Sequence, residues 1–296
     1  MSPEKIDLQS APVQTYVPKK TKAVRYCETF GKILCYPLCL CRTKKGPKTS
    51  NKVVRFSIKT FDHKATVDAL FLRGNLEKKK AVLLSLGPDF KYQHLSQDAT
   101  GFLPSLVKFI KAQLGDVHIL IPNHSDTSNT IRVQEIASCY EMLIKGEGFN
   151  PDDVIVYGHG VGALIGATAA AKIQKEYFWS KISVVLDRTG IALDQIEEHD
   201  GESKGGHVRR KTNINIQAPV EELQGDIIAI MSHHGKTIPP EKSFAKNVKR
   251  QNIEDRLSSI YIGVQAKADT HFAEFNKEEA NLVGWHLRRI LNLPNN

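Results

Sequence analysis

Three glycines spaced two residues apart form the part of the sequence best suited to chemistry. Gly158, Gly160 and Gly162 follow the apolar run Val154–Tyr157 and precede a stretch of small residues, 163–171. Glycine supplies positive φ angles and leaves room for a close backbone approach, so the pattern predicts a buried strand, a tight turn and a closely packed helix. A dinucleotide-binding loop needs the spacing G-x-G-x-x-G, which this turn lacks, and no acidic residue follows at the expected distance.

From residue 52 onward, apolar runs alternate with helical stretches. Residues 53–61 and 65–73 predict an antiparallel hairpin. Further strands are expected at 81–86, 117–121, 154–158, 182–186, 226–231 and 259–264, and helices at 100–114, 131–145, 163–171, 240–248 and 277–291. This alternation predicts an α/β domain over 52–296, with a mainly parallel sheet and helices on both faces. The polar stretch 191–224 interrupts the rhythm and predicts a lid-like insertion.

The order of these elements resembles the α/β-hydrolase fold across roughly residues 52–293. The run Gly158-His159-Gly160-Val161-Gly162 is similar to the G-H-S-x-G nucleophile elbow of serine esterases and lipases, with Gly160 at the serine position. Gly87 and Pro88 stand in the loop that donates a backbone N–H to the oxyanion hole in this family. The strand end Asp187-Arg188-Thr189 is similar to a D-R-T segment of some bacterial effector-type members.

The resemblance implies a triad of nucleophile, base and acid. Gly160 has no side chain, so acyl transfer through this position is impossible. Gly235 replaces the acid of the family's D-x-x-[VI]-P loop, whereas His271 occupies the position of the family's histidine. Asp187 stands where some members place the acid. The alternatives are that His271 is a surface or helix-start histidine, and that Asp187 pairs with Arg188 or caps the following turn.

Other residues offer less. His124 with Asp126, and His94 with Asp98, lack a recognised metal-ligand spacing. His233 and His234 are adjacent, so their side chains point apart in an extended segment. Ser125, Ser128 and Ser232 fall at strand ends, but no elbow presents them. We therefore expect no metal site and no cofactor.

The basic charge of the protein lies in its N-terminal segment, residues 1–51. Through Lys52 there are eleven Lys and Arg residues and three Asp and Glu, whereas the remainder carries 30 and 29. A balanced domain argues against nucleic-acid binding. Cys35, Cys39 and Cys41 lie in a short apolar stretch flanked by lysines and arginines, which is typical of reversible acylation at an anionic membrane surface. The alternatives are zinc binding by the four tail cysteines, although their C-x7-C-x3-C-x-C spacing is unusual, and packing of the apolar stretch onto the domain.

Three hypotheses follow for function. The first is a non-catalytic α/β-hydrolase-like protein that binds a small-molecule, lipid or protein partner. It would lie inside the cell, tethered by its tail to the cytoplasmic face of a membrane. The second is an active esterase, lipase or other acyl hydrolase whose nucleophile is shifted or has been engineered out at Gly160. The third is a scaffold module without a ligand.

Overall fold

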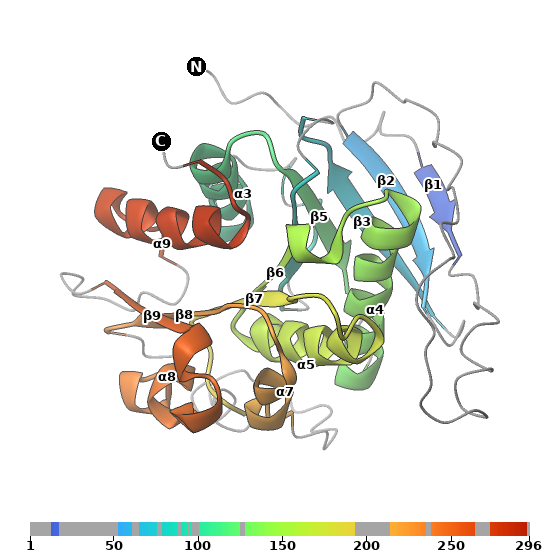
Figure 1. Ribbon diagram of the computed structural model, residues 1–296. Helices are drawn as coiled ribbons and strands as arrows, with labels where there is room; N and C mark the ends of the chain where they lie inside the picture. The colour runs from blue at the N-terminus through green and yellow to red at the C-terminus, as the bar shows by residue number, and fades with distance from the viewer. Residues whose placement is uncertain are drawn as a thin grey trace, which may run out of the picture.

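The computed structural model describes residues 13–17, 53–60, 65–75, 79–87, 90–93, 95, 101–124, 128–192, 214–234, 238–263 and 273–294. Within them, nine strands form one sheet in the order β1-β2-β3-β5-β4-β6-β7-β8-β9 (Figure 1). The strands are β1 Val13–Tyr16, β2 Val53–Lys59, β3 Thr66–Leu72, β4 Ala81–Ser85, β5 His118–Asn123, β6 Val154–His159, β7 Ser183–Asp187, β8 Ile227–Ser232 and β9 Leu257–Ile262. Strands β4 to β9 are all parallel. β4, β6, β7 and β8 are buried along their whole length, as expected of parallel strands covered on both faces.

The predicted hairpin is confirmed. Strands β2 and β3 pair antiparallel from Val53↔Leu72 to Lys59↔Thr66, and alternate residues of β2 are buried. Strand β1 then adds to the outer edge of β2 in parallel, with Val13 opposite Arg55. Its four residues lie within the segment 1–51 that charge alone separates from the domain, so the sheet extends further toward the N-terminus than the sequence pattern indicates.

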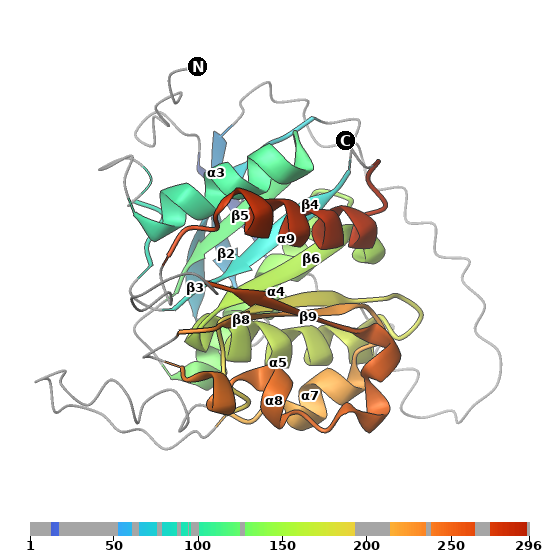
Figure 2. The same ribbon diagram turned by 90° about the vertical axis from the view of Figure 1, so that its left-hand side faces the viewer.

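Helices cover both faces of the sheet, as predicted. One face carries α3 (Phe102–Leu114) and α9 (Lys277–Ile290), which pack against each other (Figure 2). The other carries α4 (Asn129–Glu141), α5 (Val161–Glu176), α7 (Gln217–Glu222) and α8 (Phe244–Asn247). A π-helical turn, Met142–Gly146, continues α4, and short 3-10 turns occur at Pro151–Asp153, Pro240–Lys242, Arg250–Asn252 and Glu254–Arg256.

Two hydrophobic clusters follow from this layering, one on each side of the sheet. Side chains of the same central strand alternate between them: Val156 faces the α4 and α5 side, whereas Ile155 and Tyr157 face the α3 and α9 side. The alternation follows from the two-residue period of a strand. Helix α5 is rich in alanine and glycine, which lets it lie close to β4 and β6.

Two predicted segments lie partly or wholly outside the described residues. Of the lid-like insertion 191–224, residues 193–213 are outside, and the described part forms α7, which packs on α5. Residues 18–52, with the predicted acylation sites Cys35, Cys39 and Cys41, are also outside. Among the residues that are described, none of the helices is both long and apolar enough to cross a membrane.

Candidate functional site

The glycine turn stands at the centre of the carboxyl edge of the sheet, where β6 ends and α5 begins. Gly160 has φ +54° and ψ −126°, and its N–H donates to the Asp187 carbonyl at 3.0 Å. These angles are strained for any residue with a Cβ. The strand, turn and helix that the sequence predicts are therefore present, and Gly160 has no side chain at the turn.

The two flanking glycines are required by steric contact. A Cβ on Gly158 would lie 2.3 Å from Ala163 Cα, and a Cβ on Gly162 would lie 2.2 Å from the Ser85 carbonyl oxygen. Real Cβ atoms are not found this close to backbone, so both positions must be glycine for α5 to approach β4 and β6. The Ser85 hydroxyl adds a 2.7 Å hydrogen bond to the Gly162 carbonyl, which fixes the first turn of α5 on β4.

The remaining predicted residues of the elbow surround this turn. The His159 ring is buried against Phe102, with 4.2 Å between ring centroids, and Phe90 contacts it edge-on. Val161 is partly exposed at the first position of α5. Gly87 is half-buried just beyond β4, and its carbonyl accepts a bond from the Phe90 N–H. The adjoining Pro88 is outside the described residues.

Asp187, the candidate acid, is fully buried at the end of β7. Arg188 binds it with two bonds, from Nε to Oδ1 at 2.7 Å and from an Nη atom to Oδ2 at 2.9 Å. The Tyr157 hydroxyl donates to Oδ2 at 2.9 Å. Burial and the neighbouring Asp187 carboxylate raise the pKa of Tyr157, so this hydroxyl stays a donor. Of the alternatives for Asp187, pairing with Arg188 is the one that the structure contains.

Arg188 ties this ion pair to the end of the chain. Its Nη1 donates to the Ala273 carbonyl at 2.7 Å, and its guanidinium lies over the rings of Phe102 and Phe275 at 5.5 and 5.2 Å. Burial works to lower the pKa of Arg188, but the Asp187 carboxylate outweighs it and raises that pKa above its usual value. Asp187 thus accepts three hydrogen bonds within a buried ion pair. Its role as a vestigial catalytic acid stays a prediction, because His271 is outside the described residues.

The other two triad positions are outside the described residues. Neither His271 nor Gly235 is placed, so their roles stay predictions. Ala273, the first described residue after the gap that contains His271, accepts a bond from Arg188, which follows β7.

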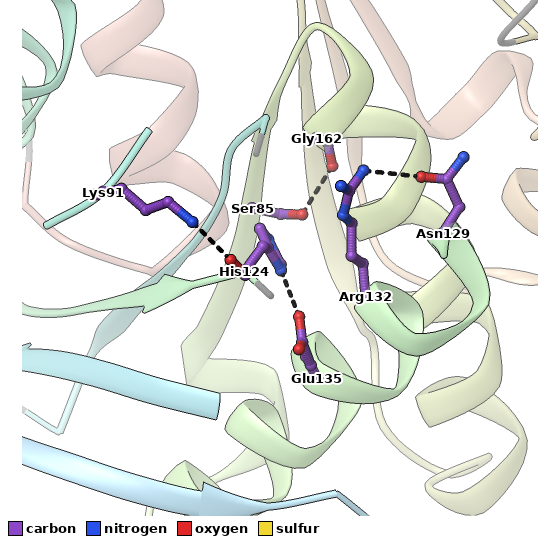
Figure 3. Close-up of polar contacts among 7 residues, drawn as sticks. All are labelled: Ser85, Lys91, His124, Asn129, Arg132, Glu135 and Gly162. Atoms are coloured by element: carbon purple, nitrogen blue, oxygen red, sulfur yellow. Dashed lines mark hydrogen bonds and ion pairs between the residues drawn. The ribbon is translucent and has the colours of Figure 1, made fainter. Parts of the chain in front are cut away.

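A second polar pair, not predicted from the sequence, lies beside the elbow (Figure 3). His124, just after β5, is buried, and its Nδ1 is 2.9 Å from Glu135 Oε2 on α4. Lys91 donates to the His124 carbonyl at 2.9 Å. Within the described chain, His124 Nε2 has no hydrogen-bond partner. A carboxylate at one ring nitrogen of a histidine orients the ring, and a neutral imidazole so held carries its proton on that nitrogen and can accept a proton on the other.

Among the described residues drawn in Figure 3, Ser85 carries the hydroxyl beside this pair, and that hydroxyl donates to the Gly162 carbonyl. Asp126, which the sequence pairs with His124 as a potential metal ligand, is outside the described residues. Among those that are described, no three His, Cys, Asp or Glu side chains gather as a metal site. A signal for the pair did exist, since Glu135 falls between the buried positions Val133 and Ile136 of α4.

No protein-family model and no curated protein matches the sequence. Solved structures match its three-dimensional structure. An esterase from Pyrococcus furiosus superposes with a TM-score of 0.61 at 13% identity, over 80% of this chain and 90% of that one. A fungal esterase from Rhizomucor miehei gives 0.56 at 11%, over 81% and 84%. An alpha-beta hydrolase from Vibrio vulnificus gives 0.55 at 11%, over 81% of each chain.

A mainly parallel sheet with helices on both faces places the chain in the α/β class. The chain has the α/β-hydrolase fold. At these identities the likeness concerns the fold alone, and function has to be argued from the site.

Proposed function

We propose that the protein is a non-catalytic member of the α/β-hydrolase fold that binds a ligand at the carboxyl edge of its sheet. The single observation that carries the proposal is Gly160. Its φ of +54° and ψ of −126° keep the elbow, but the apex has no nucleophilic atom. The turn also lets α5 pack closely on β4 and β6, so the fold would retain it in a protein without catalytic activity.

The ion pair supports the same proposal. Asp187 already accepts bonds from Arg188 and Tyr157. An acid so engaged is poorly suited to orient a histidine, because a triad acid must hold the imidazole in one tautomer. The ligand, a small molecule, lipid or protein partner, would then bind to the elbow without being cleaved.

The test uses a fluorophosphonate probe and p-nitrophenyl esters on the unmodified protein. We expect no labelling and no ester hydrolysis above the rate of a matched buffer blank. The variant Gly160→Ser restores a hydroxyl at the apex and serves as the comparison for labelling at the elbow. Stoichiometric labelling of the unmodified protein at any residue would overturn the non-catalytic assignment.

We further propose that the N-terminal segment tethers the protein to the cytoplasmic face of a membrane. Residues 18–52 contain ten Lys and Arg residues and one Glu, beside Cys35, Cys39 and Cys41. Each basic residue near an anionic surface contributes about 1 kcal/mol, and acylation supplies the second signal that stable anchoring requires. Because β1 lies within residues 1–51, removing that whole segment would also remove an edge strand.

Charge neutralisation in the full chain is therefore the cleaner test of the tether. The variant Lys44→Gln, Lys45→Gln, Lys48→Gln keeps β1 and should weaken co-sedimentation with anionic vesicles. It should also flatten the dependence of binding on salt. Unchanged co-sedimentation of this variant would count against the tether.

An active acyl hydrolase with a shifted nucleophile is the second candidate. The observation that favours it is the buried His124–Glu135 pair, in which no described residue bonds to His124 Nε2. If this candidate is correct, the fluorophosphonate probe labels the unmodified protein and the variant His124→Gln abolishes labelling. Retained labelling in that variant would exclude His124 as the base.

A further inference from the structure

A turn at the far end of α5 exposes two large aromatic side chains. Phe178 is 66% exposed and Trp179 is 68% exposed, which makes them the most exposed large hydrophobic side chains of the described chain. Their rings contact each other edge-on, with 4.9 Å between centroids. Exposing so much aromatic surface in one place is unfavourable in water and indicates a contact surface. We call residues 177–180 the aromatic turn.

The aromatic turn is held rigidly by one buried side chain. The amide nitrogen of Gln174, which is 3% exposed, donates to the carbonyls of Tyr177 and Ser180 at 3.2 and 2.8 Å. Its amide oxygen accepts from the N–H groups of Ile182 and Gln224, each at 3.2 Å. All four hydrogen bonds available to this amide are thus made. The two aromatic rings are presented from a fixed backbone, so little entropy is lost when they are buried in a contact.

The aromatic turn also lies near the place where the basic segment leaves the fold. Tyr16, the last residue of β1, and Tyr177 both lie near the Glu141 carboxylate. Burial, and then the charge of Glu141, raises the pKa of each phenol. Val17 follows, 45% exposed, and the chain then continues into residues 18–52. Tyr177, the first residue of the aromatic turn, therefore lies near Tyr16, the last residue of β1.

The aromatic turn and the N-terminal segment differ in charge. Near the aromatic turn, Lys175 pairs with Glu222 at 3.0 Å, and the Asp152 carboxylate accepts a bond from the backbone N–H of Lys181. The strong positive charge belongs to residues 18–52. Long-range attraction to an anionic surface would come from that segment, and the aromatic turn offers rings of the kind that settle at the membrane–water interface.

We propose that Phe178 and Trp179 insert into the head-group region of an anionic membrane, as a second contact beside the N-terminal segment. The inference rests on the proposed membrane tether. If the aromatic turn binds a protein partner instead, lipid vesicles should not change the fluorescence of Trp179. The experiment below therefore separates a membrane contact from a protein contact.

The chain contains two tryptophans, and this allows a matched experiment. Trp285 is 42% exposed on α9, on the opposite face of the sheet, with Arg289 over its ring at 5.6 Å. The full-length variant Trp285→Phe leaves Trp179 as the reporter, and Trp179→Phe leaves Trp285 as the control. Each is titrated with vesicles of about two parts phosphatidylcholine to one part phosphatidylserine, with and without brominated acyl chains.

We expect the emission of Trp179 to shift to the blue and to be quenched by the brominated lipid, while Trp285 does neither. The full-length variant Phe178→Ser, Trp179→Ser should bind these vesicles roughly tenfold more weakly, with an unchanged melting temperature, since burying two aromatic rings is favourable. The matched variant Leu282→Ser, Trp285→Ser should bind as the unmodified protein does.

The outcomes distinguish the inference from the tether. If the protein co-sediments with vesicles but Trp179 neither shifts nor is quenched, the aromatic turn is not a membrane contact, and the tether stands. If the unmodified protein fails to co-sediment at all, the tether fails and the inference fails with it. Equal responses of Trp179 and Trp285 would indicate non-specific adsorption and would also overturn the inference.

Discussion

Separating Asp187 from Arg188 should destabilise the protein more than most single substitutions. The two side chains are 0% and 1% exposed and share two hydrogen bonds, so removing one partner leaves an uncompensated charge in the core. Breaking such a pair costs about 3–5 kcal/mol. We expect Asp187→Asn to fall in this range. Arg188→Met should reach its upper end, because it also loses the bond to Ala273 and two aromatic contacts.

The double variant Asp187→Asn, Arg188→Met tests the physical reason. With both charges gone, no buried ion is left unpaired, so the double variant should lose less stability than the two single losses added together, by about 2 kcal/mol. Urea unfolding followed by circular dichroism gives the three free energies of unfolding. Additive losses would refute the coupling. A loss below about 1 kcal/mol for Asp187→Asn would refute the structural assignment, because surface-like tolerance is incompatible with a buried partner.

Three further predictions concern the glycine turn, a buried histidine and the aromatic turn. Gly162→Ala, whose Cβ would lie 2.2 Å from the Ser85 carbonyl oxygen, should cost more stability than Gly160→Ala, whose backbone strain at φ +54° costs about 1–3 kcal/mol. Equal melting temperatures of the two variants would contradict this. Burial lowers the pKa of His118, so the folded state disfavours its charged form and loses stability as the pH falls below the ordinary histidine value of 6.5. His118→Gln should reduce that loss, and identical urea midpoints against pH for both proteins would argue against it. Gln174→Leu should cost about 2–4 kcal/mol in thermal unfolding, since four backbone groups lose a hydrogen bond and those of Ser180 and Ile182 lose it in a buried position. A neutral result would show that the aromatic turn is not held by Gln174.

The layers of the fold were predictable because burial leaves a periodic record in the sequence. Strands such as Ala81–Ser85 are apolar at every position, which occurs where both faces are covered. The order β5-β4-β6 and the edge position of β1 were not predictable in the same way. Pairing depends on contacts between distant segments, and Val13–Tyr16 is short, alternating and embedded in a polar stretch.

At the candidate site, the sequence predicted backbone better than side chains. Glycine tolerates a positive φ and close contact with neighbouring backbone, so the spacing of Gly158, Gly160 and Gly162 was enough to place the turn. Asp187 was ambiguous because its neighbour Arg188 could either pair with it or point elsewhere. Adjacent side chains of an extended strand point to opposite faces. Arg188 has φ +50°, which is not extended, so its side chain can bond to the neighbouring Asp187.

The His124–Glu135 pair was missed for a different reason. The two residues are eleven positions apart, and their meeting depends on how α4 is rotated against the end of β5. A helix with apolar and polar residues mixed on its buried side does not reveal that rotation from sequence.

Helix α5 joins the two surfaces on which function is proposed here. It begins at the glycine turn and ends at the aromatic turn, and its 16 residues span about 24 Å. With the aromatic rings in a head-group layer, an upright α5 would hold the elbow about three Debye lengths from the lipid charge, since that length is about 8 Å at physiological ionic strength. A ligand reaching the elbow would then meet ordinary bulk water, unaffected by the surface potential. Such an orientation favours a water-borne molecule or a soluble partner over an acyl chain drawn from the bilayer.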